Sequence, residues 1–228
     1  MLKNKSYIGI SFIILIFGIY AIPKIIERVQ NNDIVKGDRL DKVVTTSTNS
    51  SNLVKIGPAP KFDLINQDNI KVTNETYKGK VYVLEFFFST CPTICPKMNQ
   101  SMLVIEKMFF GNPNFGIVSI SIDPEHDTPA VLKAHRELLG VESSNWNFLT
   151  GNKKYIFELA NKGFNLYAGE NKNVTGGFEH SGLFALIDKK GNIRCRKDDY
   201  GNPILYYDGL EKKGVRDIQQ DIAILLKE

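Results

Sequence analysis

The sequence is poor in cysteine, with three among its 228 residues. Three thiols are too few for a disulfide scaffold, so the fold must depend on an apolar core. Hydrophobic residues make up 43% of the chain, which is enough for one sizeable domain. Cys91 and Cys95 are only four positions apart, and this spacing indicates redox or metal chemistry. Cys195 follows a turn and is interpreted as an ordinary strand residue.

The sequence also lacks a strong excess of one charge. It contains 29 Lys and Arg against 25 Asp and Glu, a net charge of +4, and the two signs are mixed along the chain. Phosphate backbones attract clustered basic side chains, and the sequence has no such cluster. We therefore expect no nucleic-acid partner.

Residues 7–22 form a stretch without charge, preceded by Lys3 and Lys5. As a helix this stretch reaches about 24 Å, slightly short of the roughly 30 Å hydrocarbon core. A cleaved signal peptide is the alternative, but the best cleavage triplet, 19–21, begins with a bulky Ile. We expect an uncleaved membrane anchor over residues 1–29, single-pass in the cell inner membrane. The N-terminal charges slightly favour a soluble domain on the extracytoplasmic, periplasmic side.

The polar residues 30–55 contain few aromatics and cannot bury enough surface to hold one conformation. They predict a flexible linker, followed by one folded domain over residues 56–228.

Within this domain the pattern alternates between strands and helices. Residues 81–88 are almost unbroken apolar sequence, interrupted only by Glu85, which is typical of a strand buried on both faces. Further strands are expected at 62–65, 70–72, 116–122, 146–149, 183–187 and 193–196, and helices after the cysteines, after 127–129, at 153–162 and near 215–226. This order predicts an α/β fold, a three-layer sandwich with parallel central strands, an N-terminal β-hairpin and a closing antiparallel hairpin, as in thioredoxin-like folds.

The helix after the cysteines has an apolar stripe at three- and four-residue steps. It consists of Met98, Met102, Ile105, Met108 and Phe109. We interpret the methionines as core residues rather than copper ligands.

Cys91 and Cys95 lie between the buried strand and this helix, with Pro96 in the first helical turn. Unpaired N–H groups at a helix N-terminus favour thiolate over thiol. A spacing one residue longer than C-x-x-C lets both sulfurs face one ion. Two thiolates favour Cu(I) over harder cations, although Zn²⁺ accepts the same ligands.

A third ligand must come from elsewhere, and the chain has three histidines. His135 falls within a charged helix and is expected to be solvated. His126 lies in a loop and is expected to serve turn and capping roles. His180 ends a glycine-containing loop directly before an apolar strand, which makes it the candidate ligand.

Three blocks of sequence resemble the Sco/SenC copper-chaperone family. They are FFFSTCPTICP at 86–96, SIDPEHDTP at 121–129 and EHS at 179–181, in the family's order. The resemblance covers roughly residue 56 to the C-terminus. It implies a thioredoxin-like domain that binds one copper ion, Cu(I) and possibly Cu(II), through Cys91, Cys95 and His180. It also implies a copper-acceptor protein as partner, the cytochrome c oxidase subunit bearing the copper A site.

The chain departs from the family just before the histidine, where the family commonly has aspartate and this sequence has Glu179. Glu179 is a candidate to orient His180 or to offer an oxygen to Cu(II), with a solvated loop carboxylate as the plain alternative. Asp123, after a predicted strand, is a second candidate for the outer part of the site, or a turn residue.

Two further functions use the same cysteines. A membrane-anchored thiol-disulfide oxidoreductase would reduce acceptor cysteines with the Cys91–Cys95 pair. A peroxidase relative would need one low-pKa cysteine beside an arginine, and the motif contains no arginine. We expect a metallochaperone rather than an enzyme.

Overall fold

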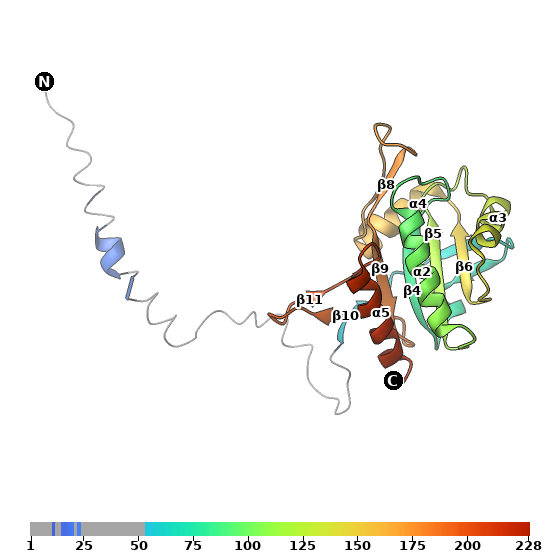
Figure 1. Ribbon diagram of the computed structural model, residues 1–228. Coiled ribbons are helices and arrows are strands. Elements are labelled where there is room, and N and C mark those ends of the chain that lie inside the picture. The colour runs from blue at the N-terminus through green and yellow to red at the C-terminus, as the bar shows by residue number, and fades with distance from the viewer. Residues whose placement is uncertain (1–10, 12–14, 21, 24–52) are drawn as a thin grey trace, which may run out of the picture. The chain divides into compact units, whose positions relative to one another are not determined.

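The computed structural model describes residues 11, 15–20, 22, 23 and 53–228 (Figure 1). The chain divides into two units, Met1–Asn49 and Ser50–Glu228. Most of the predicted anchor and linker lies outside the described residues, so those boundaries stay predictions. Among the residues that are described, no helix is both long and apolar enough to cross a membrane.

The second unit is built on a mixed sheet in the order β1-β10-β9-β4-β5-β6-β2-β3. Strands β4, β5 and β6 are parallel, and antiparallel strands flank them on both sides. The strands are β1 Val54–Pro58, β2 Asp63–Asn66, β3 Lys71–Thr73, β4 Val81–Phe87, β5 Phe115–Ser121, β6 Trp146–Thr150, β9 Leu183–Ile187 and β10 Asn192–Lys197. Short strands β11 Pro203–Ile204 and β12 Tyr207–Asp208 pair with β10 and β9. Both predicted hairpins, β2–β3 and β9–β10, are confirmed.

Four α-helices in this unit accompany the sheet. They are α2 Cys95–Phe109, α3 Pro129–Leu139, α4 Lys153–Glu158 and α5 Lys212–Leu225. The predicted start of α3 is confirmed: Thr128 accepts a bond from the N–H of Val131, and Gly140 ends the helix at φ 71°. The helix expected at 153–162 is instead α4 followed by a π-helical turn, η3 Leu159–Phe164.

Successive side chains of β4 contact helices on opposite faces of the sheet. Phe87 stacks on His135 of α3, with ring centroids 5.6 Å apart, whereas Phe86 contacts Phe164 of η3 at 6.0 Å. The β4-α2-β5 and β5-α3-β6 connections advance in the same direction, and right-handed crossovers then put α2 and α3 on one face. Helix α5 lies beside α2 (Figure 1). The three-layer prediction is therefore confirmed.

Two expectations about individual residues are wrong. His135 is half-buried rather than solvated, because its ring packs against Phe87 and Phe148 under α3. Met108 is 58% exposed and lies off the buried stripe, whereas Met98 and Met102 are fully buried. A step of ten residues from Met98 has turned the α-helix too far for Met108 to reach the sheet.

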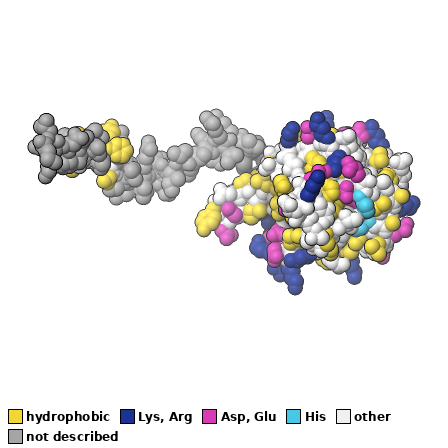
Figure 2. Space-filling model, turned by 90° about the horizontal axis from the view of Figure 1, so that it is seen from above, with side chains coloured by type: hydrophobic (Ala, Val, Ile, Leu, Met, Phe, Trp, Pro, Cys, Tyr) yellow, Lys and Arg dark blue, Asp and Glu magenta, His cyan; other side chains and the backbone are white. Residues whose placement is uncertain are grey.

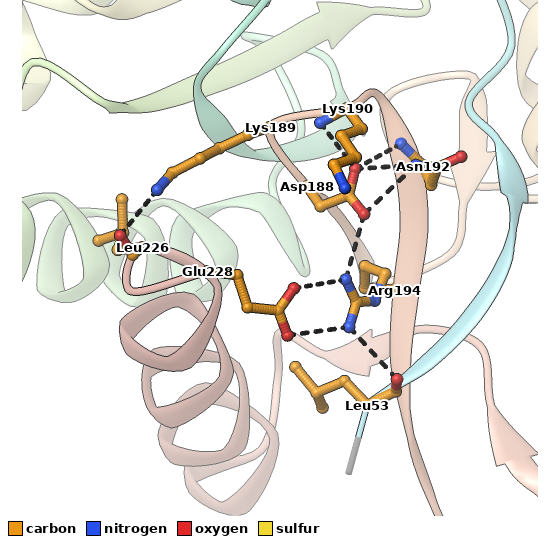
Figure 3. Close-up of polar contacts among 8 residues, drawn as sticks. All are labelled: Leu53, Asp188, Lys189, Lys190, Asn192, Arg194, Leu226 and Glu228. Carbon is orange, nitrogen blue, oxygen red and sulfur yellow. Dashed lines mark hydrogen bonds and ion pairs between the residues drawn. The ribbon is translucent and has the colours of Figure 1, made fainter. Parts of the chain in front are cut away.

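The C-terminus is tied to the β9–β10 hairpin by a group of charged residues (Figure 3). The guanidinium of Arg194 donates to Asp188 at 3.2 Å, to Glu228 at 2.8 Å and to the carbonyl of Leu53 at 3.3 Å. This arginine therefore links the last residue and the start of β1 to the sheet. Over the visible face of the molecule, basic and acidic side chains are interspersed (Figure 2).

Candidate metal centre

The two cysteines are held at the junction of β4 and α2. The backbone N–H of Cys91 donates to the carbonyl of Phe88 at 3.3 Å, which closes a turn directly after β4. Cys95 is the first residue of α2, and Pro96 occupies the first helical turn, where no hydrogen bond is lost. Both thiols are buried, Cys95 more completely than Cys91.

His180 reaches the cysteines from a separate two-stranded ribbon. It ends β8 Phe178–His180, which pairs antiparallel with β7 Ala168–Glu170. Its Nε2 lies 3.0 Å from the Sγ of Cys95, and its Nδ1 lies 3.1 Å from the carbonyl oxygen of Ser181. A carbonyl only accepts, so Nδ1 donates to Ser181 and Nε2 is the ring nitrogen that faces the sulfurs. The ring edge of His180 also contacts Phe88.

These three side chains form one compact donor group. The ligand atoms of Cys91, Cys95 and His180 all lie within 4.8 Å of one another, and all three residues are buried. The structure thus brings together the three residues that the sequence predicted as ligands. Two thiolates and one imidazole suit Cu(I) or Zn²⁺, and three donors leave room for a ligand from another protein.

The two thiols share one proton. A hydrogen bond from Cys95 lowers the pKa of Cys91 to about 3, with His180 and backbone N–H groups acting in the same direction against the effect of burial. The bond to Cys91 and burial raise the pKa of Cys95. The metal-free pair therefore carries about one negative charge, on Cys91, at neutral pH.

The cysteine loop is anchored by Asp127, a residue that the sequence analysis placed only at a helix start. Asp127 is fully buried and accepts bonds from the backbone N–H of Ser89, at 3.0 Å, and from the hydroxyls of Ser89 and Ser121. The Nδ1 of His126 also contacts it at 2.9 Å, and this contact raises the pKa of His126. Asp127 thus fixes the backbone two residues before Cys91 to the end of β5.

A glycine allows the histidine loop to lie directly on the cysteine loop. Gly176 has φ +94°, and a Cβ there would come within 3.0 Å of the Phe88 ring and 3.3 Å of Pro92. A side chain at this position would both strain the backbone and push the two loops apart. The Gly-Gly pair in the sequence indicated a loop but not this close packing.

The remaining candidates have other positions. The carbonyl of Ser181, not Glu179, contacts the His180 ring. Glu179 and Asp123 lie outside the three-residue donor group. The backbone carbonyl of Asp123 accepts hydrogen bonds from the N–H groups of His126 and Asp127, so Asp123 has the predicted alternative role of a turn residue. Burial and the nearby charge of Asp127 raise the pKa of the Asp123 side chain. Cys195 is buried within β10, as expected for a strand residue.

The part of the chain that holds these three residues matches a known protein family. The SCO1/SenC family model matches residues 54–212. The SCO1 protein homolog of Bacillus subtilis is 33% identical over 167 residues, covering 71% of this chain and 79% of the relative.

Two solved structures share the fold. BsSco, a member of the Sco family of cytochrome c oxidase assembly proteins with a disulfide switch, superposes with a TM-score of 0.63 at 29% identity, covering 75% of this chain and 95% of that one. Yeast Sco1 with copper bound superposes with a TM-score of 0.54 at 25% identity, covering 73% and 89%. The match over residues 54–212, together with these folds, shows that the chain belongs to the Sco/SenC family and has a thioredoxin-like fold.

Proposed function

We propose that this protein is a copper chaperone, which binds one copper ion through Cys91, Cys95 and His180 and delivers it to the copper A centre of cytochrome c oxidase. The 4.8 Å grouping of two sulfurs and one imidazole nitrogen supports this function most directly. Copper bound to yeast Sco1, and the description of BsSco as an oxidase assembly protein, support it by family membership.

The residues of the site are suited to taking up and releasing such a cargo. Cys91 supplies a thiolate before the ion arrives, and Cys95 loses the shared proton when it becomes a ligand. Nε2 of His180 already faces the sulfurs because the carbonyl of Ser181 holds the other ring nitrogen. The described residues would supply three donors to the ion, so an acceptor protein could add its own ligand before these three dissociate.

Anaerobic Cu(I) titration against a competing chelator tests the ligand set. We expect one copper per wild-type chain, no stable binding in Cys91→Ser or Cys95→Ser, and at least a roughly tenfold weaker affinity in His180→Ala. Cys195→Ala is the matched control, a buried thiol outside the site. His135→Ala is a poorer control, because the ring packs on Phe87. Unchanged affinity in His180→Ala would contradict the proposed site.

We propose a second function with the same thiols, reduction of an acceptor disulfide. The low pKa of Cys91 favours it, since a thiolate is the attacking species. Cys91 would attack the acceptor disulfide, and Cys95 would then lose its proton and resolve the mixed disulfide, passing two electrons to the acceptor. Oxidase assembly in cells separates the two functions: if it survives in His180→Ala but not in the cysteine variants, reduction is the function.

We propose that residues 1–29 anchor the protein in the inner membrane, that 30–55 form the linker, and that the copper-binding domain lies on the periplasmic side. The helical residues Leu15, Ile16 and Phe17 expose 54–71% of their surface, as membrane-facing side chains would. Cell fractionation with protease treatment of spheroplasts tests the location. A protected domain, or one released without detergent, would contradict it.

A further inference from the structure

The ribbon that carries His180 forms a sheet of its own. Strands β7 and β8 pair with each other, separately from the large sheet. A two-stranded ribbon is marginally stable by itself, so its position depends on contacts with the rest of the domain. A groove of about 780 Å³ lies between β7 and the helical residues of α4 and η3, and residues of all three elements line it. The ribbon is therefore held on this side by the side chains that bridge the groove.

One bridging side chain is Asn161 of η3. It donates to the carbonyl of Ala168 at 2.7 Å and accepts the N–H of the same residue at 3.2 Å. Ala168 lies opposite His180 in the ribbon. Asn161 thus fixes the start of β7, and the other end of the ribbon is held by a different residue.

Lys153, at the start of α4, contacts both strands at that other end. Its ammonium group forms an ion pair with Glu170 of β7 and lies 5.3 Å from the centroid of the Phe178 ring of β8. Glu170 and Phe178 are directly opposite each other in the ribbon. The same group lies 3.5 Å from Glu125, in the loop after β5. The side chain of Glu125 is 76% exposed and that of Glu170 is 48% exposed, so the ion pair with the ribbon is the better shielded from water.

A row of rings continues from Lys153 to the candidate copper ligand. The ring of Phe178 lies 5.5 Å from that of Phe88, and the ring of Phe88 lies 5.8 Å from that of His180. Phe88 is buried, and its carbonyl accepts the N–H of Cys91, so it belongs to the base of the cysteine loop. A contact that holds Phe178 against Phe88 therefore also holds the strand that ends in His180.

We propose that Lys153 is a positioning residue for His180: its ammonium group holds the β7–β8 ribbon beside α4 and so keeps the imidazole at the two sulfurs. This inference rests on the proposed copper site, since it concerns how the third ligand is presented. Molecules with a displaced ribbon offer copper only the two sulfurs, and the apparent affinity falls with the fraction of competent molecules. A cation over a partly exposed ring shifts such an equilibrium by up to about fivefold.

The test is an anaerobic Cu(I) competition titration of the full-length chain in wild type, Lys153→Met and Lys153→Arg. Methionine keeps an unbranched side chain without the charge, and its affinity should be about fivefold weaker. Arginine pairs with carboxylates and stacks on aromatic rings, so Lys153→Arg should bind copper as wild type does. Lys162→Gln is the matched control, because Lys162 pairs with Glu158 one turn earlier, and its affinity should be unchanged.

A double-mutant cycle shows whether Lys153 acts through His180. Lys153→Met should not change the copper affinity of His180→Ala, because that variant has no imidazole to position. An equal weakening in both backgrounds would overturn the inference. So would an unchanged affinity of Lys153→Met in the wild-type background.

Hydrogen exchange of the metal-free chain tests the contact with the ribbon without copper. The N–H of Ser181 donates to the carbonyl of Tyr167 across the ribbon at 3.0 Å. Its exchange should be about fivefold faster in Lys153→Met, while exchange in β4 stays the same. Equal exchange at Ser181 in both proteins would overturn the inference. A wild-type chain that bound no copper would instead contradict the proposed function, and exchange at Ser181 would still decide whether Lys153 holds the ribbon.

Discussion

Replacement of Glu85 by glutamine should change how the stability of the fold depends on pH. Glu85 is fully buried, and burial raises its pKa from 4.5 to about 7. In the unfolded chain the same carboxyl titrates at its ordinary value. Between pH 4.5 and about 7 the folded state therefore binds more protons than the unfolded state, and stability falls as pH rises through this window. Above the pKa of Glu85 in the folded state, this contribution to the free energy of unfolding is fully lost.

The size of this effect follows from the difference between the two pKa values. Each pH unit of difference is worth about 1.4 kcal/mol, so the full loss is roughly 3 kcal/mol. About 2.5 kcal/mol of it falls between pH 5 and pH 8. Glutamine keeps the shape and can accept the hydrogen bond from Ser119, but it has no charge to bury. The variant therefore lacks this pH-dependent loss of stability.

Urea unfolding of wild type and Glu85→Gln at a series of pH values measures the effect. The stability of the variant relative to wild type should rise by about 2.5 kcal/mol from pH 5 to pH 8. His135, whose pKa is lowered by burial, acts in the opposite direction as pH falls below 6.5, but it is common to both proteins and cancels in the difference. A difference that is constant over this range would refute the reasoning.

Three further substitutions test the packing around the site. Asp127→Asn should destabilise the chain by roughly 1–3 kcal/mol and speed hydrogen exchange at the backbone N–H of Ser89. The asparagine side chain has one oxygen in place of two, so it cannot accept every bond that Asp127 accepts from Ser89 and Ser121. Unchanged exchange at Ser89 would argue against the anchor. Arg194→Met should cost about 3 kcal/mol in urea unfolding because it leaves the buried Asp188 without its cation, while Lys213→Met, which breaks an ion pair of the exposed Lys213, should cost under about 1 kcal/mol. Met102→Ala should cost about 2–5 kcal/mol, compared with under about 0.5 kcal/mol for the exposed Met108→Ala; equal losses would contradict the assignment of the buried stripe.

Local patterns in the sequence were sufficient for most elements of the fold. The apolar run of β4, the turn residues of the two hairpins and the cap at Thr128 act over a few residues, so they can be interpreted without tertiary contacts. The limits of this approach appear at His135. Its charged neighbours predicted solvation, but the ring lies on the side of α3 that meets Phe87.

For the site, sequence patterns alone predicted two sulfurs at a helix start, and the family resemblance implied the histidine that completes the group. Only the tertiary structure decided that Cys95 and His180, 85 positions apart, lie 3.0 Å from each other. The packing also places Asp127 under the cysteine loop and leaves Glu85 fully buried, with one carboxylate oxygen lacking a hydrogen-bond partner among the described residues. The physical reason is that periodicity reports which side of an element is buried, whereas the partner on that side depends on how distant strands and loops pack.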